Sequence, residues 1–270
     1  LAGLPQAPSQ YSPIRDPERA KARRDDVLRR MAKEGYISDQ AARTAQAQPL
    51  GINLGSYYRK RRESYFFDYV RRQLVRDYGE DRVRAGGLKI YTTLDLKMQR
   101  AARTAIDNAV GGMDRSSAIA SVDPRNGHLK ALASSARYGE FQFDLASQGG
   151  YAAGSTFKVM VLMAAVDRGI DPKTTSYVSR PLKFNDPKYG PIDVSTYSGT
   201  YIGRANLVKA TLTSDNSIYQ QLDLDIGPPA VSDAARRMGI PKSKMHDYPS
   251  EGLGAIESGV SPLMMANAYA

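Results

Sequence analysis

Ser155-Thr156-Phe157-Lys158 has the residue types and the spacing of a serine nucleophile followed by its own base. A serine hydroxyl is a poor nucleophile at neutral pH, and it needs a base within hydrogen-bond reach to take its proton during attack. Lys158 can be that base, because burial disfavours the charged amine and pulls its pKa down from about 10.4. The pair therefore predicts acyl transfer through Ser155.

The two side chains can meet only if this segment is helical. Val159 to Val166 is an unbroken apolar run, with Gly169 in C-cap position and Pro172 beyond it, which predicts a buried helix. Residues three apart share one helix face, so Ser155 in the first turn and Lys158 one turn later point the same way. The free backbone N–H groups of that turn can hold an oxyanion.

A second short element, Ser214-Asp215-Asn216, supplies a hydroxyl and an amide further along the chain. The first element alone also fits an ordinary N-cap serine with a surface lysine in the first turn. However, the chain contains only one S-x-x-K and only one S-x-N, in the order that an acyl-serine site needs. The combination favours a catalytic site built from Ser155, Lys158, Ser214 and Asn216.

Composition sets wider limits on the function. The 270 residues are 41% hydrophobic, enough for a packed core, and they include no cysteine, which excludes disulfides and thiolate sites. His128 and His246 are far apart in sequence and have no companions at metal-ligand spacing, so both are expected to be structural or on the surface. No apolar stretch approaches the ~20 residues that cross a bilayer.

The net charge of +10 belongs to the N-terminal part of the chain. Residues 1–103 hold 22 Lys and Arg against 12 Asp and Glu, whereas the remainder holds 16 of each. Such a region can meet nucleic acid, anionic headgroups or a pyrophosphate-bearing lipid, or it can be a solvated helix face. For Arg23, Arg24, Arg29 and Arg30 the solvated face is favoured, with local ion pairs to Asp25, Asp26 and Glu34.

Turn and capping residues divide the chain into helices and strands. Ser117 to Val122 and His128 to Ser134 flank a turn containing Asn126-Gly127, which predicts a hairpin. Leu88 to Thr93 is predicted as one more strand. Antiparallel strands beside a buried helix predict an α+β domain. Another helix is expected from Asp95 onward, with these residues facing inward: Met98, Ala102, Ala105, Ile106, Ala109 and Val110. The remaining helices are expected from Asp16 to Gly35, from Ser38 to Pro49, from Phe66 to Gly79, from Ala205 to Leu212, beyond Ser214, from Pro229 to Met238, and from Ser261 onward.

Several stretches together resemble the class A penicillin-binding proteins, the bifunctional enzymes of peptidoglycan synthesis. Gly154 to Lys158 resembles the nucleophile motif of the transpeptidase domain, and Thr213 to Ser217 resembles its second motif. Residues 1–8, 11–13, 17–18 and 23–28 resemble the closing segment of the family's glycosyltransferase domain. Residues 86–95 resemble its interdomain linker, and residues 252–270 resemble the helix that precedes the third motif.

This resemblance implies the fold and a division of the chain. The expected fold is a transpeptidase domain like that of penicillin-binding proteins and β-lactamases, an antiparallel sheet with helices. Residues 1–50 are expected to be a C-terminal remnant of the glycosyltransferase domain, 51–112 a linker region, and 113–270 a transpeptidase domain without its Lys-Thr-Gly strand.

The resemblance also implies a D,D-transpeptidase that attacks the D-Ala-D-Ala bond of a stem peptide. Ser155 would form the acyl-enzyme, Lys158 would accept and return protons, Ser214 would relay a proton to the leaving group, and Asn216 would hold the substrate amide. The implied partners are stem peptides, β-lactam antibiotics, a lipid-linked precursor, and the membrane surface through the parent's anchor, on the extracytoplasmic face. The scheme needs no metal and no cofactor, and nucleic acid is not an expected partner.

Departures from the family pattern limit what the 270 residues are expected to do. No Lys-Thr-Gly follows Asn216, and the glutamates that the family uses for glycosyl transfer are absent. The chain opens without a methionine, and its last helix has no stop signal. We therefore expect a fragment that is weakly active or inactive by itself, because part of the site wall would come from the missing strand.

Three alternatives remain from the sequence. A serine β-lactamase shares the first two motifs, but it would not carry the glycosyltransferase-like opening or the linker at 86–95. A basic nucleic-acid-binding protein fits the charge, although Phe66, Phe67 and Tyr69 fall on or beside an amphipathic helix stripe, where packing is commoner than base stacking. A catalytically dead scaffold of wall synthesis is the third.

Overall fold

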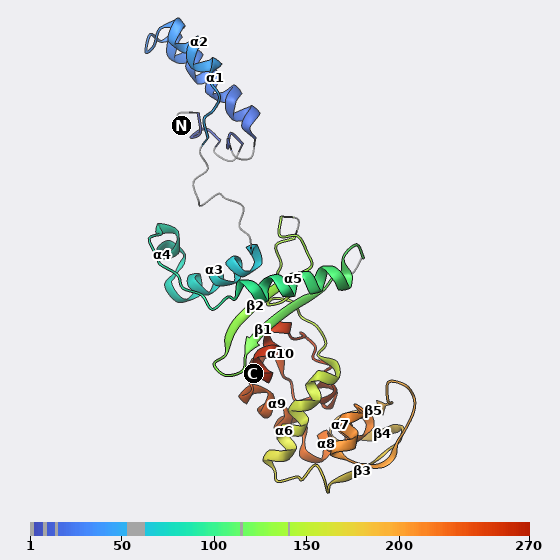
Figure 1. Ribbon diagram of the computed structural model, residues 1–270. Helices are drawn as coiled ribbons and strands as arrows, with labels where there is room; N and C mark the ends of the chain where they lie inside the picture. Colours follow the sequence, from blue (N-terminus) through green and yellow to red (C-terminus); the bar gives the residue numbers. More distant parts are fainter. Residues whose placement is uncertain (1–2, 8–9, 14–15, 53–62, 114–115, 140) are drawn as a thin grey trace. The chain divides into compact units, whose positions relative to one another are not determined.

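The structure is a computed structural model of the 270 residues, and it describes residues 3–7, 10–13, 16–52, 63–113, 116–139 and 141–270. These form two compact units, 1–62 and 63–270 (Figure 1). Residues 53–62, which belong to the predicted linker region 51–112, lie outside the described residues. None of the described helices combines the length and the apolar character needed to span a membrane.

The first unit is a pair of helices, α1 (Pro17–Lys33) and α2 (Asp39–Ala47), both as predicted. Asp16 caps α1 by accepting from the backbone N–H of Arg19. Arg24 ties the pair together, since its guanidinium donates to the carbonyls of Gln48 and Gln46 at 2.7 and 3.0 Å. The Gln46 amide adds another hydrogen bond between the two helices, donating to the Asp25 carbonyl at 2.9 Å.

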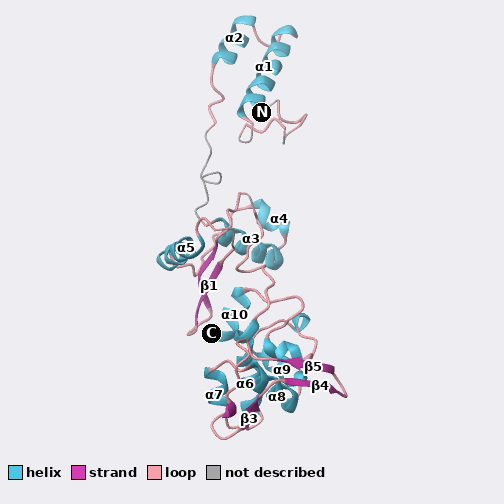
Figure 2. Ribbon diagram, turned by 90° about the vertical axis from the view of Figure 1, so that its right-hand side faces the viewer, coloured by secondary structure: helices cyan, strands magenta, loops and turns pink. Residues whose placement is uncertain are grey.

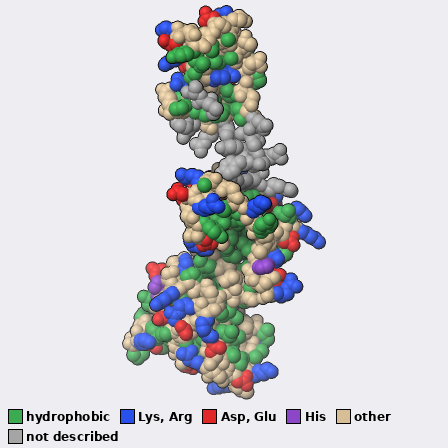
Figure 3. Space-filling model, turned by 90° about the vertical axis from the view of Figure 1, so that its left-hand side faces the viewer, with side chains coloured by type: hydrophobic (Ala, Val, Ile, Leu, Met, Phe, Trp, Pro, Cys, Tyr) green, Lys and Arg blue, Asp and Glu red, His purple; other side chains and the backbone are tan. Residues whose placement is uncertain are grey.

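The arginines of α1 make the local ion pairs that the sequence predicted. Arg24 pairs with Asp25 at 2.8 Å, and Arg29 pairs with Asp26, while the predicted pairing with Glu34 is not found among the described residues. On the face shown in Figure 3, Lys and Arg side chains lie among Asp and Glu side chains. The solvated-face interpretation fits Arg29, whose side chain is 65% exposed, whereas the Arg24 side chain is largely buried against α2.

The second unit combines helices with three two-stranded antiparallel sheets, which confirms the α+β prediction (Figure 2). The sheets pair β1 with β2, β3 with β6, and β4 with β5. The elements are α3 (Ser64–Tyr78), α4 (Glu80–Ala85), α5 (Leu96–Val110), β1 (Ala118–Asp123), β2 (His128–Ser134), the 3-10 helix η2 (Gly154–Phe157), α6 (Lys158–Asp167), β3 (Ser176–Ser179), β4 (Leu182–Asp186), β5 (Gly190–Val194), β6 (Gly203–Asn206), α7 (Leu207–Leu212), α8 (Asn216–Ile226), α9 (Pro228–Arg237), η3 (Lys242–Lys244), η4 (Pro249–Leu253) and α10 (Pro262–Tyr269).

The predicted hairpin of β1 and β2 forms around the Asn-Gly turn. Asp123 accepts hydrogen bonds from the backbone of Asn126 and Gly127, and Gly127 has a φ of 70°, which glycine adopts without steric cost. The hairpin lies between α5, which packs on β2, and α10, which packs on β1. The hairpin and the two helices bring the C-terminal segment of this unit close to its sheet.

The predicted strand at 88–93 is wrong. This segment is extended, but it forms no ladder with a neighbouring strand within the described chain. Its link to β2 consists of the Thr93 hydroxyl, which donates to the Leu129 carbonyl, and the Asp95 N–H, which donates to the Lys130 carbonyl. Tyr91 is 90% exposed, so its β-favouring side chain has no surface to pack against.

Two helix predictions also need correction. In α5 the buried residues are Gln99, Ala102 and Ile106, whereas Met98, Ala105 and Ala109 are exposed, because the hairpin covers only a narrow stripe of the helix. The helix predicted from Ala205 begins instead at Leu207, since Gly203–Asn206 forms β6 against β3. Asn206 caps α7 by accepting from the Lys209 N–H.

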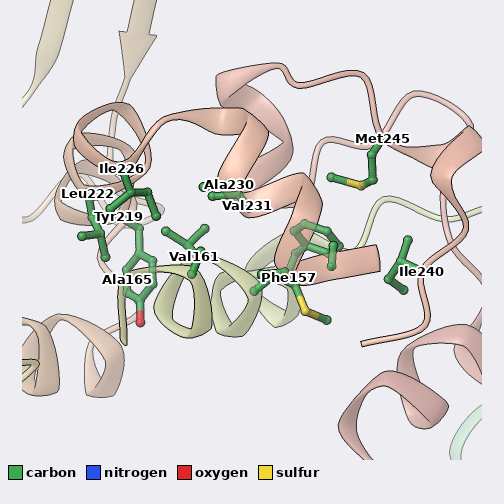
Figure 4. Close-up of a cluster of buried hydrophobic side chains, with 14 of the residues drawn as sticks. Phe157, Val161, Ala165, Tyr219, Leu222, Ile226, Ala230, Val231, Ile240 and Met245 are labelled. Atoms are coloured by element: carbon green, nitrogen blue, oxygen red, sulfur yellow. The ribbon is translucent and has the colours of Figure 1, made fainter. Parts of the chain in front are cut away.

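The core of the second unit surrounds α6, as the apolar run predicted. Phe157 and Val161 are fully buried and face Tyr219 and Leu222 of α8 and Val231 of α9 (Figure 4). Burial of side chains of this size stabilises a fold by about 1.5–3 kcal/mol each. The helix that begins with the predicted base is therefore central to the largest core cluster of the described residues, and the predicted nucleophile lies in the turn directly before it.

Asp223 on α8 is an ionisable group buried in this core. It is 1% exposed, and neither carboxyl oxygen has a hydrogen-bond partner among the described groups. The amide of the neighbouring Gln220 donates instead to the Pro249 carbonyl. Burial, with a smaller contribution from the charge of Glu251, raises the pKa of Asp223 to about 8. The carboxyl is therefore protonated at neutral pH.

Asp223→Asn should remove a pH dependence from the stability of the protein. In the unfolded chain this carboxyl ionises near pH 4, whereas in the folded protein it keeps its proton up to about pH 8. Between these limits the free energy of unfolding falls as pH rises, by up to about 1.4 kcal/mol per pH unit. Denaturant unfolding from pH 5 to pH 9 measures this slope. Asp233→Asn, at an exposed carboxylate of α9, is the control, and a wild-type slope in Asp223→Asn would contradict the assignment.

Candidate active site

The predicted nucleophile and base lie where the 3-10 helix η2 passes into α6. Ser155 is in η2 and is exposed, and Lys158 is the first residue of α6. Gly154 precedes the serine with a φ of 55°, a conformation that favours glycine. The backbone thus places the Ser155 hydroxyl at the surface, one turn before the lysine, as the spacing predicted.

The Lys158 amine reaches the second predicted motif. Its Nζ lies 2.6 Å from the carbonyl oxygen of Ser214, 3.1 Å from the Ser214 hydroxyl and 2.7 Å from Oδ1 of Asn216. Two of these partners are carbonyl-type acceptors, so they take the two N–H bonds of a neutral amine. The lone pair of the neutral Lys158 amine then remains available to accept a hydrogen bond from a hydroxyl. The structure therefore brings together Lys158, Ser214 and Asn216, with Ser155 one turn away.

Burial lowers the pKa of Lys158. The residue is 4% exposed, and the loss of solvation lowers its pKa to about 8, against an opposing attraction from the Asp215 carboxylate. The Tyr219 ring centroid lies 5.4 Å from Nζ and also favours the charged form. Desolvation is the larger effect, so a substantial fraction of this lysine is neutral at mildly alkaline pH.

The loop that carries Ser214 has an unusual backbone. Ser214 has a φ of 51°, in the left-handed region that side chains other than glycine rarely adopt. This conformation turns both the carbonyl and the hydroxyl of Ser214 toward Lys158. It costs about 1–2 kcal/mol, and the hydrogen bonds of the loop hold it.

Asp215, between the two predicted residues, anchors this loop. Its buried carboxylate caps α8 by accepting from the Ile218 N–H at 2.9 Å, and it also accepts from the hydroxyls of Ser217 and Ser179. Ser179 ends β3, so the loop is tied to the β3–β6 sheet. An aspartate directly before a helix is a typical N-cap residue. The sequence prediction did not use this signal at Asp215.

Asn216 is fixed from both ends of its amide. Oδ1 accepts from Lys158, and Nδ2 donates to the backbone carbonyl of Ser195 at 3.0 Å. The Ser195 carbonyl can only accept, so the amide orientation follows from this network. Ser195 participates through its carbonyl, which no sequence pattern indicates.

Comparison with known proteins identifies the family. Residues 118–270 match the family model described as "Penicillin binding protein transpeptidase domain". The chain belongs to the penicillin-binding protein transpeptidase family. The matched segment contains every residue of the site described above, and the match favours the transpeptidase interpretation over the β-lactamase and nucleic-acid-binding alternatives.

Relatives of the transpeptidase chain align along its whole length. It is 32% identical to penicillin-binding protein 2D of Bacillus subtilis over 276 residues, covering 100% of this chain and 39% of the relative. It is 27% identical to penicillin-binding protein 1B of Escherichia coli, covering 100% and 33%. The chain thus spans little more than a third of these proteins.

Solved structures agree with the family. The structure of the PonA1 protein from Mycobacterium tuberculosis in complex with penicillin V is similar, with a TM-score of 0.67 and 29% sequence identity, covering 76% of this chain and 57% of that one. Penicillin-binding protein 1A from Haemophilus influenzae has a TM-score of 0.66 over 99% of this chain at 20% identity, which supports the fold alone. The predicted transpeptidase fold is confirmed.

The site offers no cluster for a metal ion. Across the described part of the chain, no group of three His, Asp or Glu side chains has ligand geometry. The polar groups that contact the Lys158 amine are one hydroxyl, an amide oxygen and a backbone carbonyl, which suit proton transfer better than metal binding.

Two variants at Ser214 should separate the strain of the loop from the chemistry of the hydroxyl. Ser214→Gly removes the penalty of the positive φ, whereas Ser214→Ala keeps it, so the glycine variant should be more stable by about 1 kcal/mol. Thermal or urea unfolding measures the difference. At Ser258, an exposed residue with no positive φ, the alanine variant should instead be more stable than the glycine variant. Equal stability of Ser214→Gly and Ser214→Ala would contradict a strained Ser214.

Proposed function

We propose that this chain carries the acyl-serine site of a D,D-transpeptidase that cross-links peptidoglycan stem peptides. The observation that carries the proposal is the position of the Lys158 amine. It lies within hydrogen-bond distance of Ser214 and Asn216, and it stands one helical turn after Ser155. The catalytic roles of these four residues are part of the proposal.

The proposed reaction starts with attack by the Ser155 hydroxyl on the carbonyl carbon of the penultimate D-Ala. Neutral Lys158 accepts the serine proton, either directly or through the Ser214 hydroxyl, which lies 3.1 Å from Nζ. Backbone N–H groups of the first turn hold the negative charge that develops on the carbonyl oxygen. The terminal D-Ala leaves with a proton returned by Ser214, and an ester to Ser155 remains.

A second amine completes the exchange. The amine of a neighbouring stem peptide attacks the ester, Lys158 takes its proton, and Ser155 recovers its hydroxyl as the new amide bond forms. A β-lactam ring presents an amide to the same serine, and opening of the ring leaves a penicilloyl ester. Support for this substrate class comes from the penicillin V complex of the similar PonA1 protein.

The whole protein's activity belongs to this proposal as well. The chain spans 39% and 33% of the relatives described above. We propose, from the family resemblance of the sequence, that the whole protein also binds a lipid-linked precursor at the membrane surface, on the extracytoplasmic face. The predicted division into segments 1–50, 51–112 and 113–270 is likewise proposed. The structure groups residues 63–112 with the second unit.

Labelling with a fluorescent penicillin tests the nucleophile. We expect a covalent adduct that mass spectrometry places on Ser155 and that Ser155→Ala abolishes. Ser258→Ala removes an exposed hydroxyl on the same unit and should label like the wild type. Labelling is expected to be slow, in line with the weak activity expected from the sequence. An adduct that persists in Ser155→Ala, or that forms on another residue, would overturn the proposal.

The pH dependence of acylation tests the base. The neutral amine is the reactive form, and its fraction increases with pH through the Lys158 pKa of about 8, so the acylation rate should rise with pH and level off above this value. Lys158→Ala should slow acylation by about 10²- to 10⁴-fold and remove the rise. Lys183→Ala removes an 85% exposed side chain and should leave both the acylation rate and its rise with pH unchanged. A pH-independent wild-type rate would exclude Lys158 as the base.

A further inference from the structure

The direction in which the Ser155 hydroxyl points depends on the backbone around it. Within the described residues this hydroxyl makes no hydrogen bond, and the side chain is exposed. Its direction is therefore set by the turn formed by residues 153–158. Inside that turn, the Thr156 hydroxyl donates to the Ala153 carbonyl at 2.6 Å.

Two hydrogen bonds hold this turn from outside, and both come from the C-terminal segment of the same unit. The Gly154 N–H donates to the Gly254 carbonyl at 3.3 Å. The Tyr269 phenol donates to the carbonyl of Thr156, the residue after the nucleophile, at 2.6 Å. The turn is thus fastened on both sides of Ser155.

Gly254 lies so close to Gly154 that no side chain fits at position 254. Gly254 has a φ of 83°, and a Cβ added there would lie 2.2 Å from the Gly154 carbonyl oxygen. Tyr151 and Val260 add an antiparallel bridge with hydrogen bonds of 3.0 and 2.9 Å. The chain before Ser155 is therefore held by these backbone contacts, whereas after it the Tyr269 phenol adds a side-chain hydrogen bond to the burial of Phe157 in the core.

The Tyr269 hydroxyl is the part of this residue that contacts the turn. The residue as a whole is 55% exposed, while α10 packs on the core through Ala268, Met264 and Met265. Partial burial raises the pKa of Tyr269, so its phenol keeps its proton and remains a donor. Loss of the hydroxyl alone should leave the packing of α10 unchanged.

We propose that Tyr269 is a positioning residue for the nucleophile: its phenol fixes the Thr156 carbonyl, and the fixed turn aims the Ser155 hydroxyl at Lys158 and the substrate. The inference rests on the proposed acyl-serine function. Tyr269 touches neither the reacting atoms nor Lys158 in this role. Its effect is confined to the chemical step, because small misplacements of a nucleophile slow reaction strongly while binding contacts persist.

Tyr269→Phe tests the proposal, and Tyr65→Phe is its matched control. The Tyr65 phenol also donates to a backbone carbonyl, that of Phe141, in the same unit but outside the Ser155 turn. Stopped-flow acylation by a penicillin separates the rate constant of the covalent step from the dissociation constant of the preceding complex. We expect Tyr269→Phe to lower the rate constant about 5- to 10-fold with an unchanged dissociation constant and pH profile, and Tyr65→Phe to change neither constant.

Hydrogen exchange provides a second measurement that does not need acylation. In Tyr269→Phe, amide exchange should accelerate in a peptide that covers residues 153–158, and it should stay at the wild-type rate there in Tyr65→Phe. Wild-type acylation by Tyr269→Phe overturns the proposal, as does an equal loss in the control. If the wild type is acylated at a residue other than Ser155, the proposed function fails and the positioning role fails with it. If acylation is too weak to measure, exchange alone decides: faster exchange supports the positioning role, and unchanged exchange refutes it.

Discussion

The site depends on one buried amine that is shared between two distant segments. Lys158 begins the central core helix, and its Nζ meets three groups of the Ser214–Asn216 loop at 2.6–3.1 Å. An amine removed from water requires hydrogen-bond partners, and the loop in turn keeps a left-handed serine that is unfavourable by itself. Each segment therefore stabilises the conformation of the other, and the low-polarity surroundings that lower the lysine pKa follow from the same packing.

Rigid elements on all sides support this contact. Asp215 ties the loop to the end of β3 and to the first turn of α8, while Phe157 and Val161 fix α6 against α8 and α9. Gly254 and Tyr269 hold the turn that precedes α6. The groups that would react are thus presented by helix starts and a short loop, and the core and the C-terminal segment set their positions. Such an arrangement is suited to a reaction in which the hydroxyl must be aimed without a hydrogen bond of its own.

Much of this arrangement could be predicted from the sequence, because its strongest signals are local. The apolar run after Lys158 fixes a buried helix, and Asp16, Ser38, Asp95 and Ser261 cap helices where they were expected. The strand at 88–93 was predicted wrongly because strand propensity does not supply a pairing partner. The strands β3 to β6 were missed because they are short and carry polar residues. The contributions of Ser195 and Tyr269 have no local signal, since they depend on a backbone carbonyl and on a contact 113 positions apart.

The amide of Asn216 has a consequence for which ligands can enter. Its oxygen is occupied by the lysine, and one of its two N–H bonds is directed at the Ser195 carbonyl. A single N–H remains. In the proposed reaction, Asn216 would therefore recognise one acceptor atom at a fixed angle and would orient an incoming acyl group before any bond forms. A molecule that offers a donor at that point would meet an N–H instead of an acceptor and would be rejected by polarity rather than by size.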